Sequence, residues 1–456
     1  MKLERDLKVI AEPDVLVCGC GCAGTGAAIA AGRLGASTMV VERWGCAGGF
    51  ITAVMGSSLD GFVDLRTGLP VVGGVVFELA RLAGRVEGDI ANTRFRPSNE
   101  LRELKENPDL SPVHFDFELF KLHADRLLRK AGVRLLYHTY VVDVLLDGDR
   151  INGVVVVNKG GLGVVRPKTV IDATGDADVV ALAGAPFDID AEMQPMSLHF
   201  RIGNIKNVSY DLRVRCSGVL EKAHAEGKLG LYAGPWMAQI NPGELYFNAT
   251  RFAGNAVDPE DLTAAEIRGR EDAMLMFELF KEHLPEFKEA YFVSTGPSVG
   301  QRETRRIRGD GTLTVDDAYN GRPQEDVVVK GAWYVDRHPK GASGYHLHEV
   351  IRPYDISYRT MLPQGLSNVW AAGRCHAAES GALASSRVTV TAMGMGQAAG
   401  TAAAMAAKGN RDSRSVDIHT LQTRLLKDDV IILDRAEKIL SVGDALGDRA
   451  PQSGIR

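Results

Sequence analysis

The chain has 456 residues, of which 45% are hydrophobic and 24% are charged, and its formal net charge at pH 7 is -5. This length and composition predict a globular protein of roughly two or three domains and exclude disordered and fibrous classes. Without a strong positive charge, nucleic acid and anionic lipid are not expected as partners.

The amino-terminal residues and the cysteines indicate the compartment. The first residues lack the apolar stretch and the small-residue cleavage site of a secretory signal. The cysteines Cys18, Cys20 and Cys22 alternate with glycine, which is unlike a secreted disulfide scaffold. We therefore expect a cytoplasmic protein. No metal site is expected, because no second cysteine pair stands nearby to complete a ligand set.

A glycine-rich turn follows the first apolar run of the chain. Residues 14–18 predict a short strand, and residues 25–35 predict a helix. Between them, Gly19 permits a tight turn, Gly21 lets the backbone approach a pyrophosphate, and Gly24 lets the helix pack on the strand. This order predicts a dinucleotide site. The alternative is a glycine turn that binds nothing.

The next segment adds an acidic residue at the spacing that ribose recognition requires. Residues 38–41 predict a second strand that ends at Glu42, where a carboxylate would bond ribose hydroxyls. The glycine-rich residues 43–49 follow directly and would line a cofactor. Cys46 lies among them, and we expect it either to pack there or to contact the cofactor, with a covalent link as a further alternative.

The following region lacks the regular strand and helix units of a nicotinamide dehydrogenase. An irregular tract is predicted over 55–112 and a helix over 115–130. Strand-like residues 133–146, a turn and a second strand over 151–158 predict a hairpin. A further strand and an Ala-Thr-Gly sequence occupy 169–175. This order favours FAD over NAD.

Together with the Ala-Ala-Gly-Arg sequence at 371–374, these segments resemble the glutathione-reductase-like superfamily of FAD proteins. Residues 299–309, 354–359 and 386–400 resemble one branch of it, the FAD-dependent oxidoreductases, which are also loosely described as xanthan-lyase-like. The resemblance covers most of 12–426. It implies an α/β fold, in which a Rossmann FAD-binding domain carries an inserted α+β substrate domain.

The resemblance and the sequence pattern together suggest domain limits. Between the nucleotide segments, strands over 196–202 and 244–250 and a helix over 263–283 predict a separate unit above the flavin. The expected ranges are 1–185 and 353–434 for the FAD-binding domain, 186–352 for the substrate domain and 435–456 for a carboxy-terminal tail.

Carried over to this sequence, the resemblance implies contacts to both halves of FAD. The residues implied for the ADP half are Gly19, Gly21, Gly24, Glu42 and Arg43, with the backbone of Val141 at the adenine. The residues implied for the ribityl chain and isoalloxazine are Gly48, Gly49, Ala173, Thr174, Gly175, Gly373, Arg374 and Val388. Many relatives have an aspartate where Arg374 stands, which leaves that contact open.

An uncharged stretch over 388–407 is long enough to cross a bilayer. It consists mainly of Gly, Ala, Thr and Met, so we expect it to pack as a helix inside the protein, without membrane insertion. The resemblance implies that this helix aims its N-terminus at the flavin, where partial positive charge stabilises the reduced ring.

Histidines are the expected proton-transfer groups. His346 and His348 would share one face of an extended segment. Histidine can take a hydroxyl proton while hydride leaves carbon for flavin N5. The alternative is a loop whose histidines are simply hydrogen-bonded. His376, beside the predicted flavin, is the next candidate, whereas the apolar strand pattern around His199 predicts a core histidine.

Four arginines lie within residues 302–308 and have the planar group that binds a carboxylate at two points. Structural salt bridges are expected for most of them, and Arg302 is the one predicted to reach the substrate if any does. Tyr358 is a further candidate pocket residue.

We expect an enzyme with FAD as cofactor that transfers a hydride between flavin N5 and a small polar substrate. The substrate would be a secondary alcohol of a sugar or hydroxy acid, or would carry a carbon-carbon double bond. The alternatives are a flavin monooxygenase consuming NAD(P)H, a reduced-flavin-dependent hydratase or lyase, and a flavin-binding electron-transfer subunit. The external electron acceptor or donor stays open, and a homo-oligomer is compatible with the sequence.

Overall fold

A five-stranded parallel sheet in the order β17-β8-β2-β3-β4 forms the centre of the molecule. The computed structural model describes residues 6–56, 61–62, 64, 66, 71–83, 116–209, 211–338, 340–341, 343–344 and 350–432. The central strands are β2 (Val15–Cys18), β3 (Thr38–Val41), β4 (Arg134–Leu136), β8 (Thr169–Asp172) and β17 (Val369–Ala371). Most are short, fully buried apolar runs, as expected for parallel strands covered on both faces.

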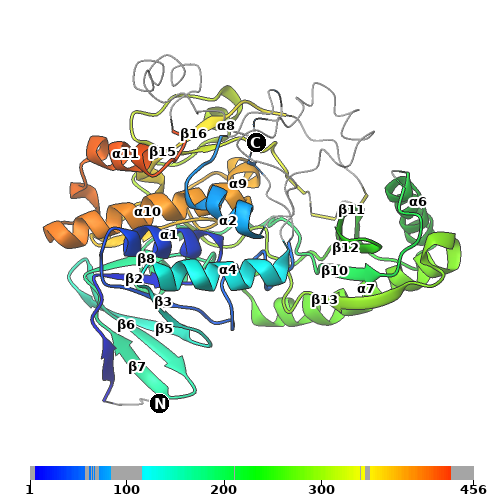
Figure 1. Cartoon of the computed structure of the whole chain (residues 1–456), viewed down its shortest axis with the longest axis horizontal. Helices are drawn as coiled ribbons and strands as arrows, with labels where there is room; N and C mark the ends of the chain where they lie inside the picture. The colour runs from blue at the N-terminus through cyan, green and yellow to red at the C-terminus, as the bar shows by residue number, and fades with distance from the viewer. Residues whose placement is uncertain are drawn as a thin grey trace, which may run out of the picture.

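Helices cover one face of this sheet. They are α1 (Cys22–Arg33), α4 (Phe117–Lys130) and α10 (Thr389–Gly409), and two further helices, α2 (Val75–Ala83) and α11 (Ile418–Lys427), pack against them. Helices α1 and α10 run side by side above the strands (Figure 1). Val15 and Val17 enter the core beneath them, whereas Leu16 and Cys18 face the other way, as the two-residue period of a strand requires. Helix α2 lies inside the tract 55–112 that the sequence predicts to be irregular.

A second sheet in the order β1-β7-β6-β5 covers the opposite face. Its strands are β1 (Lys8–Ala11), β5 (Tyr140–Asp147), β6 (Arg150–Asn158) and β7 (Gly161–Val165). The predicted hairpin is confirmed, because β5 and β6 pair in antiparallel fashion. The single strand predicted over 133–146 is wrong, since β4 belongs to the parallel sheet and the chain turns at His138, where φ is 51°.

Helices α1 and α10 approach each other closely because small residues line their contact. A Cβ atom at Gly396 would lie 1.9 Å from the carbonyl oxygen of Ala23, and one at Gly400 would lie 2.1 Å from that of Ala27. The predicted uncharged helix over 388–407 is therefore confirmed as a buried element. In the described part of the chain, no helix combines the length and the hydropathy that crossing a membrane requires.

An antiparallel sheet with two helices forms a second unit, on the right of Figure 1. Its elements are β10 (Phe200–Gly203), α6 (Leu212–Ala225), β11 (Tyr232–Asn241), β12 (Glu244–Thr250), α7 (Pro259–His283), a 3-10 helix (Pro285–Phe287) and β13 (Tyr291–Thr295). Phe200, Phe247 and Phe280 stack in its core. The helix predicted over 263–283 begins earlier, because Asp258 caps its N-terminus.

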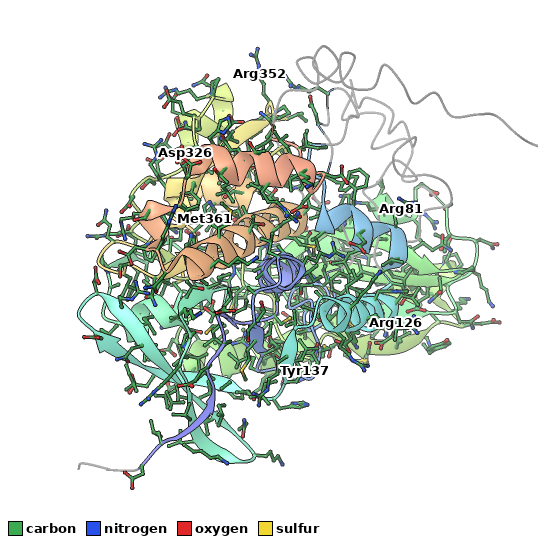
Figure 2. All side chains as sticks on the ribbon, turned by 60° about the vertical axis from the view of Figure 1, so that its left-hand side comes forward. Arg81, Arg126, Tyr137, Asp326, Arg352 and Met361 are labelled. Atoms are coloured by element: carbon green, nitrogen blue, oxygen red, sulfur yellow. The ribbon has the colours of Figure 1, made fainter. Side chains whose placement is uncertain are left out.

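Several later elements return to the first unit. They are α5 (Asp178–Leu182), β9 (Phe187–Asp188), β14 (Arg306–Ile307), α8 (Val315–Asn320), β15 (Val327–Gly331), β16 (Tyr354–Ser357), α9 (Ser380–Ser386) and 3-10 helices (Tyr358–Met361, Ser413–Ser415). Strand β15 pairs with β16 and packs on α10. Asp326 lies just before β15, and Tyr137 lies just after β4. The two residues lie on opposite sides of helices α1 and α10 (Figure 2). The range 186–352 therefore contributes elements to both units.

Candidate functional site

The glycine turn after β2 leaves no room for side chains at two of its three glycines. Gly19 has a φ of 92°, and a Cβ atom there would lie 2.5 Å from the carbonyl oxygen of Ala173. A Cβ atom at Gly24 would lie 1.9 Å from the carbonyl oxygen of Gly19. These two glycines are therefore required for the strand-to-helix turn itself.

The third glycine, Gly21, opens onto a cavity. Among the described residues, a Cβ atom at Gly21 would meet only the Cα atom of Gly49, at 3.9 Å. Gly21 is also the N-cap of α1 and has no side chain to cap the first N–H groups, while Cys22 and Ala23 line the cavity. A helix N-terminus that faces open space in this way suits a diphosphate.

Glu42, at the end of β3, is buried and bonded to backbone on both sides. One carboxylate oxygen accepts a hydrogen bond from the Cys20 N–H at 2.5 Å, and the other accepts one from the Trp44 N–H at 2.8 Å. Burial raises the pKa of Glu42, and these backbone bonds oppose that rise. Because a carboxylate oxygen accepts more than one bond, Glu42 holds the turn and still has acceptor capacity for a ribose.

A single cleft joins the glycine turn to the second unit. It encloses about 1230 Å³ between protein atoms, including its open mouth. Of the residues predicted to contact FAD, the cleft is lined by Gly21, Arg43, Gly49, Ala173, Thr174, Gly175, Gly373, Arg374 and Val388. Val388 is the N-cap of α10, so a second helix N-terminus faces the same space. Glycine backbone, two helix ends and two arginines fit an extended dinucleotide.

The other predicted FAD contacts lie beneath or beside the cleft. Gly48 has a φ of 109°, and a Cβ atom there would lie 2.7 Å from the Thr52 side chain, so this glycine is needed for the turn that follows β3. Val141 is half-buried on β5 and does not line the cleft. The glycine turn after β2 is held in shape by three residues that do not line the cleft, Gly19, Gly24 and Glu42. A direct contact of these residues with the cofactor stays a prediction.

Arg374 is anchored by an aspartate from a different strand end. Its Nη2 atom donates to the Asp176 carboxylate at 2.7 Å, and its Nη1 atom donates to the Thr304 hydroxyl at 2.7 Å. Burial alone would raise the pKa of Asp176, but the charges of Arg374 and Arg43 outweigh it and hold that pKa below its usual value. Asp176 thus holds the Arg374 side chain in place at the cleft.

The inner end of the cleft is lined by polar side chains from several segments. They are Ser197, His199, Asn248, Arg302, Asp336 and Arg387. His199 is 1% exposed, its Nδ1 atom lies 2.9 Å from the Tyr246 hydroxyl, and its ring meets Phe50 edge-on. Burial, and next the charge of Arg302, lowers the pKa of His199 to about 3. His199 is therefore the buried histidine that the sequence predicts, and it also faces the cleft.

The arginines of the segment 302–308 separate into two groups. Ion pairs join Arg305 to Asp178, Arg306 to Asp190 and Glu303, and Arg308 to Asp188. The salt bridges predicted for most of them are thus confirmed. Arg302 instead lies at the cleft, where its Nη1 atom donates to the carbonyl oxygen of Pro195 at 2.6 Å and to the Ser197 hydroxyl at 2.7 Å.

Asp336 connects the Arg387 guanidinium and the His338 ring at the same end of the cleft. Its carboxylate lies 3.3 Å from Nη2 of Arg387 and 3.0 Å from Nε2 of His338. Nδ1 of His338 accepts a hydrogen bond from Arg251 at 2.9 Å, so its Nε2 atom carries the proton that faces Asp336. Burial lowers the pKa of His338 to about 3. This network fixes the carboxylate that faces the cleft.

Two of the predicted catalytic residues lie in the core, away from the cleft. His376 is fully buried; its Nδ1 atom donates to the Gly373 carbonyl oxygen at 2.8 Å, and its Nε2 atom faces the Ser386 hydroxyl. The hydroxyl of Tyr358 donates to the Ser413 carbonyl oxygen at 2.7 Å and accepts from the Trp370 indole at 2.7 Å. Because neither side chain lines the cleft, neither is placed to meet a substrate there. His346 and His348 lie outside the described residues.

Sequence reasoning missed Asp336, Arg387 and Asn248. Each is an ordinary polar residue in its local context, and only the packing of α10 and β12 against the segment near 336 brings the three together. Arg387 had one available signal, since it directly precedes the uncharged helix whose N-terminus the sequence places at the flavin.

Replacing His376 with glutamine is expected to reduce the loss of stability in acid. Burial lowers the pKa of His376 to about 4, whereas a histidine in the unfolded chain titrates at about 6.5. Its contribution to stability is therefore complete above about pH 6.5 and is lost as the pH falls toward 4. Because glutamine does not titrate, the free energy of unfolding should fall less steeply below pH 6, by about 1.4 kcal/mol per pH unit.

Urea unfolding of the two proteins at pH 7, 6 and 5 measures this difference. The matched control is His419→Gln on the exposed surface of α11, which should keep the pH dependence of the wild type. Equal slopes for His376→Gln and the wild type would contradict a buried, neutral His376.

Several solved structures are similar to this chain over most of its length. The chain is 14% identical to a geranylgeranyl bacteriochlorophyll reductase-like protein from Thermoplasma acidophilum, with a TM-score of 0.47 over 92% of this chain and 84% of that one. It is 12% identical to L-proline dehydrogenase from P. horikoshii, with a TM-score of 0.45 over 92% and 99% of the two chains. A flavin-dependent brominase gives 16% identity and a TM-score of 0.49 over 91% and 83%. At this level the likenesses say nothing about the substrate.

The curated proteins contain no match to this chain. The family described as FAD dependent oxidoreductase matches residues 14–425, which include the glycine turn, the inner end of the cleft and helix α10. The match therefore spans both units of the fold, as the resemblance in the sequence implies. FAD is the cofactor of this family, and the chain belongs to the FAD dependent oxidoreductases.

Proposed function

We propose that this oxidoreductase transfers a hydride between FAD and a small polar substrate held at the inner end of the cleft. One observation carries the proposal: the residues of the dinucleotide turn and the buried polar side chains around Arg302 line the same continuous cleft. A cofactor that extends from Gly21 along Ala173 and Gly373 toward Val388 would leave the polar end for a second molecule.

Different residues of the chain would bind the cofactor and the substrate. Gly21, Arg43 and Arg374 would hold the diphosphate side of FAD, and the N-terminus of α10 would favour negative charge on its ring. Bound FAD supplies the hydride acceptor or donor, N5 of its ring. The protein supplies the position of the substrate, the exclusion of water and a group that exchanges a proton.

His199 is the histidine that the described structure places at the cleft. It is neutral near pH 7, because its pKa is lowered to about 3, and it is held by the Tyr246 hydroxyl. A neutral imidazole can accept the proton that leaves a hydroxyl when hydride leaves the carbon. His346 and His348 stay sequence-based candidates for the same step.

Anaerobic titration of the purified yellow protein with sugars, hydroxy acids and enoates tests the proposed function. We expect one class to bleach the flavin absorption, because a substrate that gives up hydride reduces the ring directly. Consumption of NAD(P)H with insertion of oxygen into a product would instead select a monooxygenase. If no small molecule changes the flavin spectrum and a protein partner reduces it, the proposal is wrong.

Replacing His199 with asparagine is expected to slow flavin reduction by about 100-fold to 10,000-fold, the usual contribution of a general base. FAD content should not change, since His199 lies at the substrate end of the cleft. The control is His224→Gln, because His224 bonds only backbone carbonyls at the end of α6, far along the chain from the glycine turn. Parallel His346→Asn and His348→Asn variants compare the sequence-based candidates. Stopped-flow absorbance measures the rates, and an unchanged rate for His199→Asn would remove it from the proton step.

A further inference from the structure

Arg302 is a buried cation without an anionic partner in the described structure. Its exposed fraction is 7%, and its printed partners are the neutral oxygens of Pro195 and Ser197. No carboxylate of the described residues lies within ion-pairing distance of its guanidinium, although every other arginine of the segment 302–308 has one. A buried charge without a counter-ion destabilises the fold, so a chain retains one where a ligand supplies the opposite charge.

Two further guanidinium groups surround Arg302. Burial, and then the positive charges of Arg387 and Arg251, lowers the pKa of Arg302 to about 9, while Asp336 acts in the opposite direction. The carboxylate of Asp336 is already engaged by Arg387 and His338. The positive charge of Arg302 at the inner end of the cleft is therefore not neutralised by an ion pair within the described residues.

Two buried polar atoms at the same end of the cleft have no partner among the described residues. One is Nε of Arg387, a donor, and the other is Oδ1 of Asn248, an acceptor. Buried polar atoms are nearly always hydrogen-bonded, so unsatisfied ones in a cleft mark contacts that a ligand completes. A ligand that completes both contacts would accept a hydrogen bond from Nε of Arg387 and donate one to Oδ1 of Asn248.

We propose that the cleft binds a small organic carboxylate that also has a hydroxyl or amino group, with Arg302 and Arg387 on the carboxylate and Asn248 on the donor group. This inference rests on the proposed function and names its substrate class. Guanidinium is suited to this task because its planar fork matches the two oxygens of a carboxylate. Among the substrates considered from the sequence, hydroxy acids fit and neutral sugars do not.

The same contact would adjust the proton-transfer group. The charge of Arg302 is the second cause of the low pKa of His199, after burial. A bound carboxylate neutralises that charge, which raises the pKa of His199 toward the value of a useful base. Substrates with the anionic group would thus prepare His199, whereas neutral alcohols of the same size would not.

Binding to the oxidised holoenzyme tests the proposal, because a shift of the visible flavin band reports binding whereas bleaching of the band reports turnover. Propanoate and lactate are compared with their neutral amides, propanamide and lactamide, under anaerobic conditions. The readouts are the perturbation of the visible flavin spectrum and the shift of Tm with ligand concentration. Both carboxylates should bind and both amides should not. Lactate should bind about fivefold more tightly than propanoate, because its hydroxyl gives Asn248 one neutral hydrogen bond.

Arg302→Met should raise the Kd of both carboxylates by about 100-fold, the loss of charge-assisted hydrogen bonds to a buried cation. Arg302→Lys keeps the positive charge but lacks the planar guanidinium group. Its Kd for both carboxylates should therefore lie between the values of the wild type and of Arg302→Met. Asn248→Leu should remove only the difference between lactate and propanoate. The matched control is Arg305→Met, because Arg305 belongs to the same segment but pairs with Asp178 away from the cleft.

Each outcome decides for or against the carboxylate contact. Equal binding of acids and amides by the wild type would overturn it, and this comparison does not depend on any variant folding. An unchanged Kd in Arg302→Met, or an equal loss in Arg305→Met, would overturn it as well. Carboxylate binding through Arg302 with no flavin reduction by any hydroxy acid would leave the contact standing and refute hydride transfer. Flavin reduction by neutral alcohols alone would support hydride transfer and refute the carboxylate contact.

Discussion

Replacing Gly21 with valine is expected to give a folded protein that does not retain FAD. Gly21 has ordinary backbone angles, with a φ of -67°, and a Cβ atom there would meet only the Gly49 Cα atom at 3.9 Å among the described residues. The fold thus tolerates a side chain. The added methyl groups would, however, project into the space where the α1 N-terminus faces the cleft. Loss of one or two charge-assisted bonds to the diphosphate should weaken FAD binding by at least about 100-fold.

FAD content after purification, from the ratio of visible to ultraviolet absorbance, measures this effect. Gly21→Ala should give an intermediate loss. The control is Gly218→Ala in α6, where a Cβ atom meets nothing within 4 Å and no cofactor site is near in the chain. Circular dichroism and apo-protein Tm should match the wild type for Gly21→Val. A yellow Gly21→Val protein with normal FAD content would exclude the glycine turn as the site of the diphosphate.

Replacing Gly396 with valine is expected to destabilise the fold itself. A Cβ atom at Gly396 would lie 1.9 Å from the carbonyl oxygen of Ala23, and backbone cannot move aside as a flexible side chain can. Helices α1 and α10 must then separate along their whole contact. Overpacking of this kind costs about 3 kcal/mol or more, which is a large part of the roughly 5–15 kcal/mol by which domains are stable. FAD binding should fail as well, since both helix N-termini face the cleft.

Thermal unfolding of the apo-protein distinguishes this variant from Gly21→Val, because only Gly396→Val should lower the Tm. The control is Gly409→Ala at the last turn of α10, where a Cβ atom approaches only the flexible Arg411 side chain, at 3.1 Å. That substitution should be neutral or slightly stabilising. Wild-type Tm for Gly396→Val would show that the two helices do not pack as closely as described.

The dinucleotide site could be predicted from the sequence because its parts are contiguous. Strand, turn and helix lie within residues 14–35, and the roles of Gly19 and Gly24 follow from local backbone geometry alone. The buried helix after Arg387 was predictable for the same reason, since its small uncharged residues suit close packing wherever it lies. Arg302 could be singled out among its neighbours by residue type, although only the structure shows that the others are paired.

The substrate end could not be predicted, because its residues become neighbours only through tertiary packing. Ser197 and Asn248 lie on or beside neighbouring strands of the second unit, whereas Asp336 and Arg387 belong to segments that return to the first unit. No local pattern relates these positions. Tyr358 shows the opposite error, because the sequence favours it as a pocket residue but hydrogen bonds to Ser413 and Trp370 hold it in the core.

The pairing of α1 with α10 constrains when the protein acquires its cofactor. One helix begins near the start of the chain and the other near its end, and each contributes one of the two helix N-termini at the cleft. At 5–20 residues per second, a ribosome needs roughly 20–70 s to proceed from Arg33 to Thr389. Throughout that interval the face of α1 that packs on α10 is uncovered, so chaperones gain time to bind it and flavin loading must wait until α10 has been synthesised.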